Sequence, residues 1–448
     1  MTTELPVTAL VARRAAELDY ALIPAEIRAV ARQCFLDWFA VTLAGSREEL
    51  SQIIAAEAAL EGEGGSATLV GLGRKTAPLL AALVNGTTSH ALDYDDIHLS
   101  FLGHPTVTLV PAILAAGETA GASGRDLLTA FVAGYETICR VGLTVAPGHY
   151  GRGFHATATA GSFGAAAACA RLMRLDPERT AIALGIAATQ AAGLKSMFGT
   201  MCKPLHAGKA AQNGLLAARL AARGFTSRPD AVECAQGFAA TQAPAFRPEA
   251  ALEEPPGGYY LRGNLFKYHA ACYLTHAAIE CARAIATRPG FAPEQIAKIV
   301  VRIDRGADKV CNILSPRTGL ELKFSLRFTV ALALSGLDTA SLATYTDART
   351  QDPELKALAG KVEIAFERGW DAARSELTAT LTDGSVLEAT HDAGVPAADV
   401  AAQGRHIEAK FLSLAEPVLG APNARRLAAA IGALDELRHT RDLMALAG

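Results

Sequence analysis

The segment IPAEIRAVARQCFLDWFAVTLAG (residues 23–45) carries the pattern that decides the fold class. A proline stands near its start, apolar residues recur every three or four positions, and a glycine closes it, as in an amphipathic helix. Three later segments repeat the pattern: GRDLLTAFVAGYETICRVGL (124–143), PERTAIALGIAATQAAGL (177–194) and AAQNGLLAARLAARGF (210–225). Many of their inward positions are Ala or Gly, which permits helices to approach closely. Residues 1 to about 245 are therefore predicted to be helical throughout.

The pattern changes after Lys267. The alternating, β-branched segment IAKIVVRID (296–304) predicts a strand, and SELTATLTDGSVLEAT (375–390) predicts a hairpin that turns at its Asp-Gly pair. Helical segments such as LKFSLRFTVALALSG (322–336) lie between them. We therefore expect a mainly α protein, with a helical domain over residues 1–264 that is completed by residues 398–448. An inserted, smaller α+β domain is expected over residues 265–397.

Composition excludes several classes of partner. The 448 residues are 50% hydrophobic with a formal net charge of −3, and no basic tract suggests binding to nucleic acid. No run of eighteen apolar residues predicts a membrane span, and the N-terminal residues do not resemble a signal peptide. Eight cysteines lie scattered without a CxxC pair. They favour reduced, mostly buried thiols in a cytoplasmic protein.

The stretch HALDYDDIHLSFLGHP (90–105) concentrates three histidines and three aspartates. It could be a metal site, an acid–base site or a polar turn. His90 and Asp93 would share a helical face, but HExxH and paired-cysteine spacings are absent, so we expect no metal here. For Asp95 and Asp96 the plain alternative is a helix end with solvated carboxylates, and we expect that for at least one of them.

Four basic or titratable residues stand near predicted helix starts. They are His104 before Pro105, His155 after a glycine-rich turn, Lys203 before Pro204, and Lys267 before a helix that contains Tyr273 and His276. Helix N-termini attract anions, so a converging set would suit a small polycarboxylate. The alternative is that each is an ordinary loop residue, because polar groups favour helix starts in any case. Cys202, beside Lys203, is expected to be a buried structural thiol.

Ordered motifs along nearly the whole chain resemble the MmgE/PrpD family. They are NGTTSHALDYDDIH (85–98), GHPTVTLVPAILAAGE (103–118), GHYGRGFHATATAGSFGAAAA (148–168), FGTMCKPLHAGKAAQNG (198–214), GFTSRPD (224–230), KYHAACYLTHAAIE (267–280) and PRTGLELKFSLRF (316–328). The resemblance implies a helical domain with a smaller α+β lid domain and an active site between them. It also implies a homodimer, no cofactor, and no essential metal in most members.

Position by position, the resemblance implies five catalytic residues, and four further residues are candidates for substrate binding. The catalytic set is Asp93 of the H-x-x-D-[FY]-D-D motif, His104 of the His-Pro pair, His155, Lys203 of K-P-[LM]-H, and Lys267. The substrate-binding set is His98, Tyr150, His206 and Lys323. Two positions depart from the dehydratase and decarboxylase pattern. Ile97 stands where a hydroxylic residue is often found, and Phe328 where a tyrosine is often found.

The leading functional hypothesis is a cofactor-independent lyase of the hydro-lyase type, similar to 2-methylcitrate dehydratase. It would abstract a proton next to a carboxylate of a small di- or tricarboxylic acid, with His104 and His155 moving protons and the lysines stabilising charge. The missing hydroxyls make an epimerase of an amino-dicarboxylate the runner-up, and a decarboxylase of the cis-aconitate type is a further alternative. A polycarboxylate-binding protein without catalysis is the non-enzymatic alternative.

Overall fold

The computed structural model describes residues 5–62 and 64–448, and these divide into two compact units. The first, called the helical unit below, comprises the chain up to Phe266 together with Ala397–Gly448; the second, the α+β unit, is Lys267–Pro396. The prediction of a mainly α protein with a smaller α+β part is confirmed. Among the described residues, no helix combines the length and the apolar character that crossing a bilayer requires.

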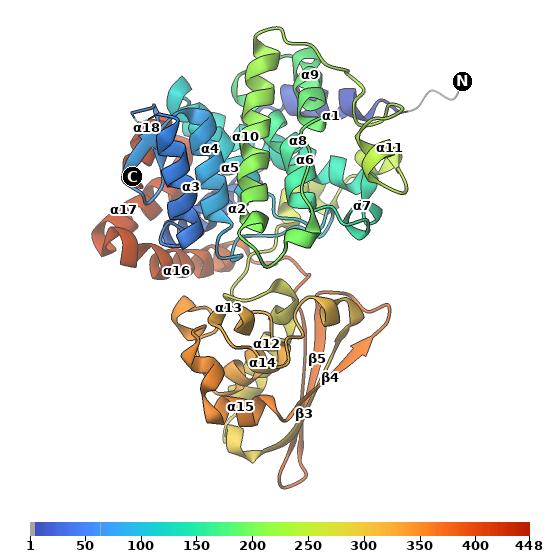
Figure 1. Cartoon of the computed structure of the whole chain (residues 1–448), viewed down its shortest axis with the longest axis vertical. Coiled ribbons are helices and arrows are strands. Elements are labelled where there is room, and N and C mark those ends of the chain that lie inside the picture. The colour runs from blue at the N-terminus through green and yellow to red at the C-terminus, as the bar shows by residue number, and fades with distance from the viewer. Residues whose placement is uncertain (1–4, 63) are drawn as a thin grey trace. The chain divides into compact units, whose positions relative to one another are not determined.

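The helical unit consists of helices and one short hairpin (Figure 1). Its elements are α1 (Val7–Glu17), α2 (Ala25–Gly45), α3 (Glu49–Leu60), β1 (Ala67–Leu69), β2 (Arg74–Thr76), α4 (Pro78–Ser89), α5 (Thr106–Ala120), α6 (Gly124–Val145), α7 (Gly148–Gly151), α8 (Ala156–Leu172), α9 (Pro177–Ala188), α10 (Cys202–Ala222), α11 (Phe238–Gln242), α16 (Val400–Leu419), α17 (Ala421–Gly432) and α18 (Thr440–Met444). The first segment singled out above thus forms α2.

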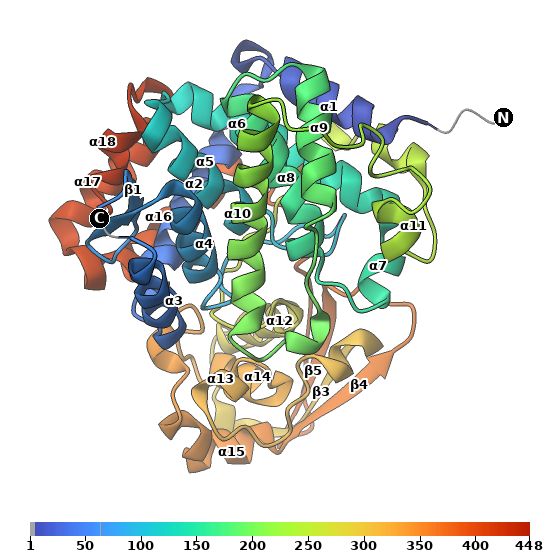
Figure 2. The same ribbon diagram turned by 45° about the horizontal axis from the view of Figure 1, so that its top comes forward.

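Helix α8 forms the centre of the helical unit. All residues from Ala156 to Ala170 are buried, and α8 packs against α5, α6, α9 and α10 (Figure 2). Fifteen buried positions in succession explain why its sequence shows no polar face: neighbouring helices surround it on every side. The aromatic core lies beside it on α2 and α6, where Phe35 and Phe131 are within 5.3 Å of each other, measured between ring centroids.

Glycines let the site-bearing helices approach one another closely. A Cβ atom on Gly86 of α4 would lie 2.7 Å from the Cα atom of Gly208 on α10. A Cβ atom on Gly134 of α6 would lie 2.7 Å from the carbonyl oxygen of Gly164 on α8. No side chain fits at these crossings without moving the backbone. The small residues noted in the sequence therefore set how near the ends of α4 and α10 come together.

The C-terminal segment returns to the helical unit after the α+β unit. Helix α16 packs along α2, and α18 packs against α5. The buried ammonium of Lys410 on α16 lies 2.6 Å from Oδ1 of Asp37 on α2, and it also donates a hydrogen bond of 2.7 Å to the carbonyl oxygen of Tyr94. The ion pair joins α16 to α2, and the hydrogen bond to Tyr94 joins α16 to the stretch of residues 90–105.

The α+β unit contains a four-stranded sheet with the order β4-β3-β5-β6. Strand β3 is parallel to β4 and antiparallel to β5, and β5 and β6 form the hairpin predicted at Asp383-Gly384. Helices α12 and α14 contact each other and pack on the sheet. The elements are α12 (His276–Ala286), β3 (Ile296–Asp304), α13 (Gly319–Leu322), α14 (Leu326–Leu334), α15 (Pro353–Ala359), β4 (Val362–Glu367), β5 (Arg374–Leu381) and β6 (Val386–Asp392).

Candidate active site

The stretch from His90 to Pro105 is a compact turn between α4 and α5, not a continuous helix. Helix α4 ends at Ser89 and His90 caps it. Asp93 adopts a left-handed conformation with φ of 50°, which Asp tolerates better than most residues. The expectation of a helical face shared by His90 and Asp93 is therefore wrong, although both side chains reach the same place.

Each residue from Asp93 to Asp96 is held by a different partner. Oδ1 of Asp93 lies 2.8 Å from Nζ of Lys203, at the start of α10. The Tyr94 carbonyl accepts from Lys410, as described above. Asp95 and Asp96 are fully buried, so the expectation that at least one of these carboxylates is solvated is wrong. The turn places four consecutive residues in four separate environments.

Asp95 lies between two histidines. Its Oδ1 is 2.8 Å from Nδ1 of His90, and its Oδ2 is 2.9 Å from Nδ1 of His104. Burial opposes ionisation of Asp95, but His90 and His104 outweigh it, and the pKa of Asp95 lies well below its ordinary value. Burial also lowers the pKa of His90 to about 4 despite its carboxylate partner. At neutral pH the pair is therefore a neutral imidazole hydrogen-bonded to a carboxylate.

The hydrogen bonds of His104 define which nitrogen is available for chemistry. Nδ1 of His104 donates to the main-chain carbonyl of Asp96 at 2.9 Å, and because a carbonyl only accepts, the proton must be on Nδ1. Nε2 lies 3.7 Å from Oδ1 of Asp93, too far for a hydrogen bond. The side chain is 12% exposed. In neutral His104 the basic Nε2 is therefore free to exchange a proton with a ligand.

The side chain of Asp96 is held in place by the first residue of α5. Its carboxyl group accepts hydrogen bonds from the hydroxyl and the main-chain N–H of Thr106, in the first turn of α5. Burial raises the pKa of Asp96 to about 8 against the effect of these bonds. Asp96 thus ties the turn to α5, while its carbonyl oxygen orients His104.

His155 and His206 form a second pair of histidines, beside the pair of His90 and His104. His155 caps the N-terminus of α8, and its main-chain N–H donates to the Gly193 carbonyl at 3.0 Å. The two Nδ1 atoms of His155 and His206 are 3.0 Å apart. The His155 ring stacks at 6.1 Å from the ring of His90 and meets Phe198 edge-on at 4.9 Å. The two histidine pairs therefore belong to one cluster.

The structure thus brings together five of the sequence-predicted residues in the helical unit: Asp93, His104, His155, Lys203 and His206. They lie at the N-termini of α5, α8 and α10 and at the turn after α4. The first N–H groups of α10 donate to Thr200, and the Thr106 N–H of α5 donates to Asp96. The positive ends of the helix dipoles nevertheless add to the charge of Lys203. A carboxylate ligand would find the Lys203 ammonium and a positive potential here.

Other predicted residues lie elsewhere in their units. Lys267 opens the α+β unit, and the main-chain carbonyl of Lys323, after α13, accepts from the N–H of Cys272 at 3.0 Å. The ring of Tyr150 lies 3.5 Å from Nζ of Lys195, measured to the ring centroid. Phe328 is buried in α14.

His98 differs from the other histidines of the stretch because both its ring nitrogens are occupied. Nε2 donates to the Tyr260 carbonyl at 2.9 Å, and Nδ1 accepts from the N–H of Ser100 at 3.1 Å. This favours a structural role. Next to it, Ile97 exchanges two main-chain hydrogen bonds with Leu265. The residue that lacks the expected hydroxyl thus ties the turn to the chain just before Lys267.

Two ion pairs in and near the cluster were not predicted from the sequence. His90 and Asp95 belong to the quoted motif, but the motif does not show that they contact each other. Lys410 and Asp37 belong to none of the motifs. Cys202 was expected to be buried and is exposed, because α10 begins at that residue, where its side chain is not covered. Six of the other cysteines are buried, as expected, and Cys234 is partly exposed.

The distances would also permit a metal ion. His90, Asp93, Asp95 and His104 each offer one ligand atom, and these atoms lie within 4.8 Å of one another. The same groups already bind one another and Lys203, and the ammonium of Lys203 would repel a dication from Asp93. The donor set fits a metal by residue type, but its proton and ammonium partners favour an acid–base cluster.

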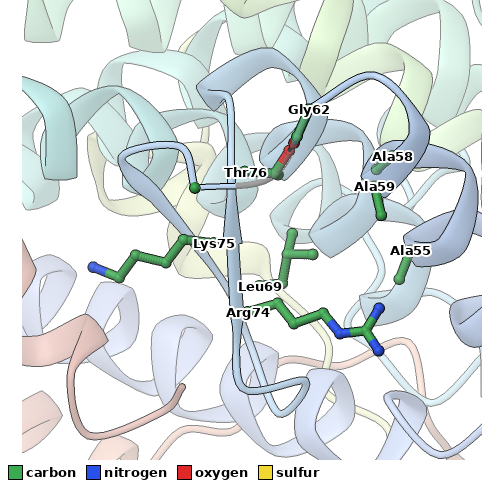
Figure 3. A pocket seen from close by; sticks show the side chains of 9 residues that line it. Ala55, Ala58, Ala59, Gly62, Leu69, Arg74, Lys75 and Thr76 are labelled. Atoms are coloured by element: carbon green, nitrogen blue, oxygen red, sulfur yellow. Dashed lines mark hydrogen bonds between the residues drawn. The ribbon is translucent and has the colours of Figure 1, made fainter.

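Two pockets of the helical unit lie outside this cluster. One of about 310 Å³ lies between α3 and the β1–β2 hairpin (Figure 3). Its lining combines alanines with Arg74 and Lys75, and the Lys75 ammonium pairs with Glu118 at 3.1 Å. A second of about 300 Å³ is lined by α1 and α6 and includes Glu136 and Arg140. Neither combines a histidine with a lysine as the cluster does.

Comparison with known proteins supports the motif-based resemblance. The MmgE/PrpD N-terminal domain matches residues 10–250, and the MmgE/PrpD C-terminal domain matches residues 269–436. A cis-aconitate decarboxylase-like protein, oryM, of Aspergillus oryzae is 32% identical over 62% of this chain, which spans 61% of that relative's length. A cis-aconitate decarboxylase of Aspergillus terreus is 28% identical over 82% of this chain and 79% of its own length.

A cis-aconitate decarboxylase of Homo sapiens is 27% identical over 69% of this chain and 67% of its own length. Because the two family domains together cover most of the sequence in the expected order, the chain belongs to the MmgE/PrpD family.

Proposed function

We propose that this chain is a lyase that acts on a small tricarboxylic acid by breaking a bond next to a carboxylate-bearing carbon. One observation carries the proposal: Lys203, Asp93 and His104 meet at three helix ends, with the basic Nε2 of His104 open to a ligand. The cation can hold a carboxylate of the substrate, and the imidazoles can exchange protons with it. The proposal needs no cofactor.

Decarboxylation of an unsaturated tricarboxylate is the first candidate reaction. The bond to one carboxyl group breaks and carbon dioxide leaves. The electron pair forms a new C=C bond, and the original double bond shifts its electrons to the carbon beside another carboxylate. That carbon takes up one proton. Lys203 would stabilise the negative charge during this shift, and His104 or His155 would deliver the proton. The names of the relatives in Aspergillus and human favour this reaction.

Dehydration of a hydroxy tricarboxylate is the second candidate, and the open nitrogen of His104 favours it. With Nδ1 protonated by its bond to the Asp96 carbonyl, Nε2 is a base that could remove the proton next to a carboxylate. A second group would protonate the departing hydroxyl. Epimerisation of an amino-dicarboxylate would use the same pair on opposite faces of one carbon.

A substrate panel in D₂O distinguishes these reactions. The protein is incubated with cis-aconitate, citrate, 2-methylcitrate, malate and iminodisuccinate, and each is followed by proton NMR. Loss of a carboxyl group supports decarboxylation, and an alkene formed from a hydroxy acid supports dehydration. Deuterium uptake without loss of substrate supports epimerisation. Thermal stabilisation by these acids without any reaction would contradict the proposal and would leave a polycarboxylate-binding protein.

A further inference from the structure

The contact between His155 and His206 joins two identical atoms. Their Nδ1 atoms are 3.0 Å apart, and the rings lie 5.3 Å apart at 53°. Burial lowers the pKa of His155 well below its ordinary value, and the nearby Lys203, His90, His104 and His206 lower it further. Burial also lowers the pKa of His206, helped by His90 and Lys203. Both rings are therefore neutral at pH 7.

Two neutral imidazoles can share this contact in two ways only. If His206 carries its proton on Nδ1, then Nδ1 of His155 accepts and Nε2 of His155 carries a proton, which makes it an acid. If the shared proton is on His155, then Nε2 of His155 is a base. The position of one bridging proton thus decides what His155 offers to a ligand, and neither ring becomes charged in either state.

The two rings also differ in access to water. The His155 residue is 2% exposed, whereas His206 is partly exposed. His206 lies on α10 three residues after Lys203, so both side chains project from the same side of the helix. A path of two imidazoles therefore leads from a wetter position to the buried cluster.

We propose that His206 is a proton-relay residue that passes a proton from solvent to His155 while His155 protonates the substrate. A hydrated proton binds Nε2 of His206, the Nδ1 proton of His206 passes to Nδ1 of His155, and the Nε2 proton of His155 passes to the substrate carbon. After product release, water in the open site returns a proton to Nε2 of His155. The bridging proton then moves back, and Nε2 of His206 releases its proton to solvent.

The relay rests on the proposed function and adds its proton supply. Decarboxylation turns a trianion and one proton into a dianion and carbon dioxide, so each turnover consumes one proton. Dehydration and epimerisation consume none overall. A relay is therefore most useful for the first candidate reaction. The competing explanation is structural: His206 could simply hold the ring of His155 in place through the hydrogen bond.

Two substitutions distinguish a proton relay from a purely structural role of His206. His206→Asn keeps an amide near the position of Nδ1, so it can hold His155 but cannot pass a proton. His206→Ala removes both functions and leaves space for added imidazole. We expect both variants to lose about 10- to 100-fold in kcat with little change in KM. Lys209→Ala, one turn further along α10 and exposed, is the matched control and should retain wild-type rates.

Chemical rescue provides the sharpest readout. Imidazole at millimolar concentration should restore kcat of His206→Ala in a saturable way and should leave the wild type, His206→Asn and Lys209→Ala unchanged. A wild-type kcat in His206→Asn would overturn the relay, as would a His206→Ala variant that imidazole does not stimulate. Circular dichroism confirms that each variant is folded, and if His206→Ala is not, the Asn variant alone decides.

A measurement without turnover keeps the two proposals separate. If the wild type converts no acid of the panel, the proposed function fails. Ring-nitrogen NMR of ¹⁵N-histidine-labelled protein then still tests the relay. Nitrogen shifts that average between the two tautomers of His155 support it, whereas one fixed tautomer overturns it.

Discussion

Each of the two units contains a buried histidine beside a carboxylate, and their surroundings differ. In the α+β unit, Nε2 of His269 lies 2.7 Å from Oε1 of Glu280 and Nδ1 lies 2.8 Å from the Thr339 hydroxyl. Both ring nitrogens are thus occupied. In the helical unit, His104 uses Nδ1 only, and its Nε2 faces Asp93 without a hydrogen bond. We therefore propose that a ring nitrogen left open next to a cation, rather than burial and pairing alone, distinguishes the functional histidine.

The largest expected effect is on activity and separates the two histidines. His104→Ala and Lys203→Ala should each lower kcat/KM for the accepted tricarboxylate by at least about 10³-fold, because they remove the proton-transferring group and the cation. His269→Gln should retain activity within about threefold. Steady-state assays on folded proteins, checked by circular dichroism, test this. Equal losses at His104 and His269 would erase the distinction.

The next effect is on stability and concerns Lys410. Lys410→Met removes the ammonium that pairs with the buried carboxylate of Asp37, so the free energy of unfolding should fall by about 3–5 kcal/mol in urea titrations. The double variant Asp37→Leu and Lys410→Met removes both charges and should recover most of that loss. Its activity should stay low, because the Tyr94 carbonyl still lacks its donor. Recovery of both properties would show that Lys410 does not position the turn.

A smaller effect on activity is expected at Asp93. Asp93→Asn keeps the shape and tolerates the positive φ, but it removes the charge facing Lys203 and His104. We expect kcat to fall about 10- to 100-fold, measured under saturating substrate. Glu280→Gln is the equivalent change beside His269 and should leave kcat unchanged. An unchanged kcat for Asp93→Asn would remove this carboxylate from the site.

The smallest effect concerns a carboxylate with no histidine partner. Burial raises the pKa of Glu136 to about 7, against the lowering effect of main-chain N–H donors at Tyr260 and Leu261 and of Arg140. The folded state therefore prefers the protonated acid. That stabilisation is complete below about pH 4.5 and is lost as the pH rises towards 7.

Unfolding titrations at pH 5 and pH 8 test this with Glu136→Gln. The neutral amide should lose less stability between these values than the wild type does, and its activity should follow the wild-type pH profile. Identical losses of stability in both proteins would show that Glu136 is not the titrating group.

Local patterns allowed much of this structure to be predicted. The apolar periodicity of residues 23–45 depends on neighbours along the chain, and so does the Asp-Gly turn at 383–384; both elements formed as expected. His104 before Pro105 and Lys203 before Pro204 could be placed at helix starts for the same reason. These predictions needed no knowledge of which helices pack together.

Contacts between distant residues could not be predicted in this way. Burial of Asp95 and Asp96 depends on α4 and α5 closing around the turn, so the expectation that at least one of them is solvated is wrong. Lys410 is 316 residues from Tyr94, and nothing local in either segment signals the bond. The contact between His155 and His206 likewise depends on how α8 meets α10.

The proposed decarboxylation is tested most directly by the stoichiometry of one reaction. Wild-type protein is incubated with cis-aconitate in D₂O, and carbon dioxide is measured alongside the proton NMR spectrum of the product. The account predicts one carbon dioxide released and one deuteron incorporated for each substrate consumed, with both abolished in Lys203→Ala. Recovery of unchanged cis-aconitate, or its conversion without release of carbon dioxide, would contradict decarboxylation at this site.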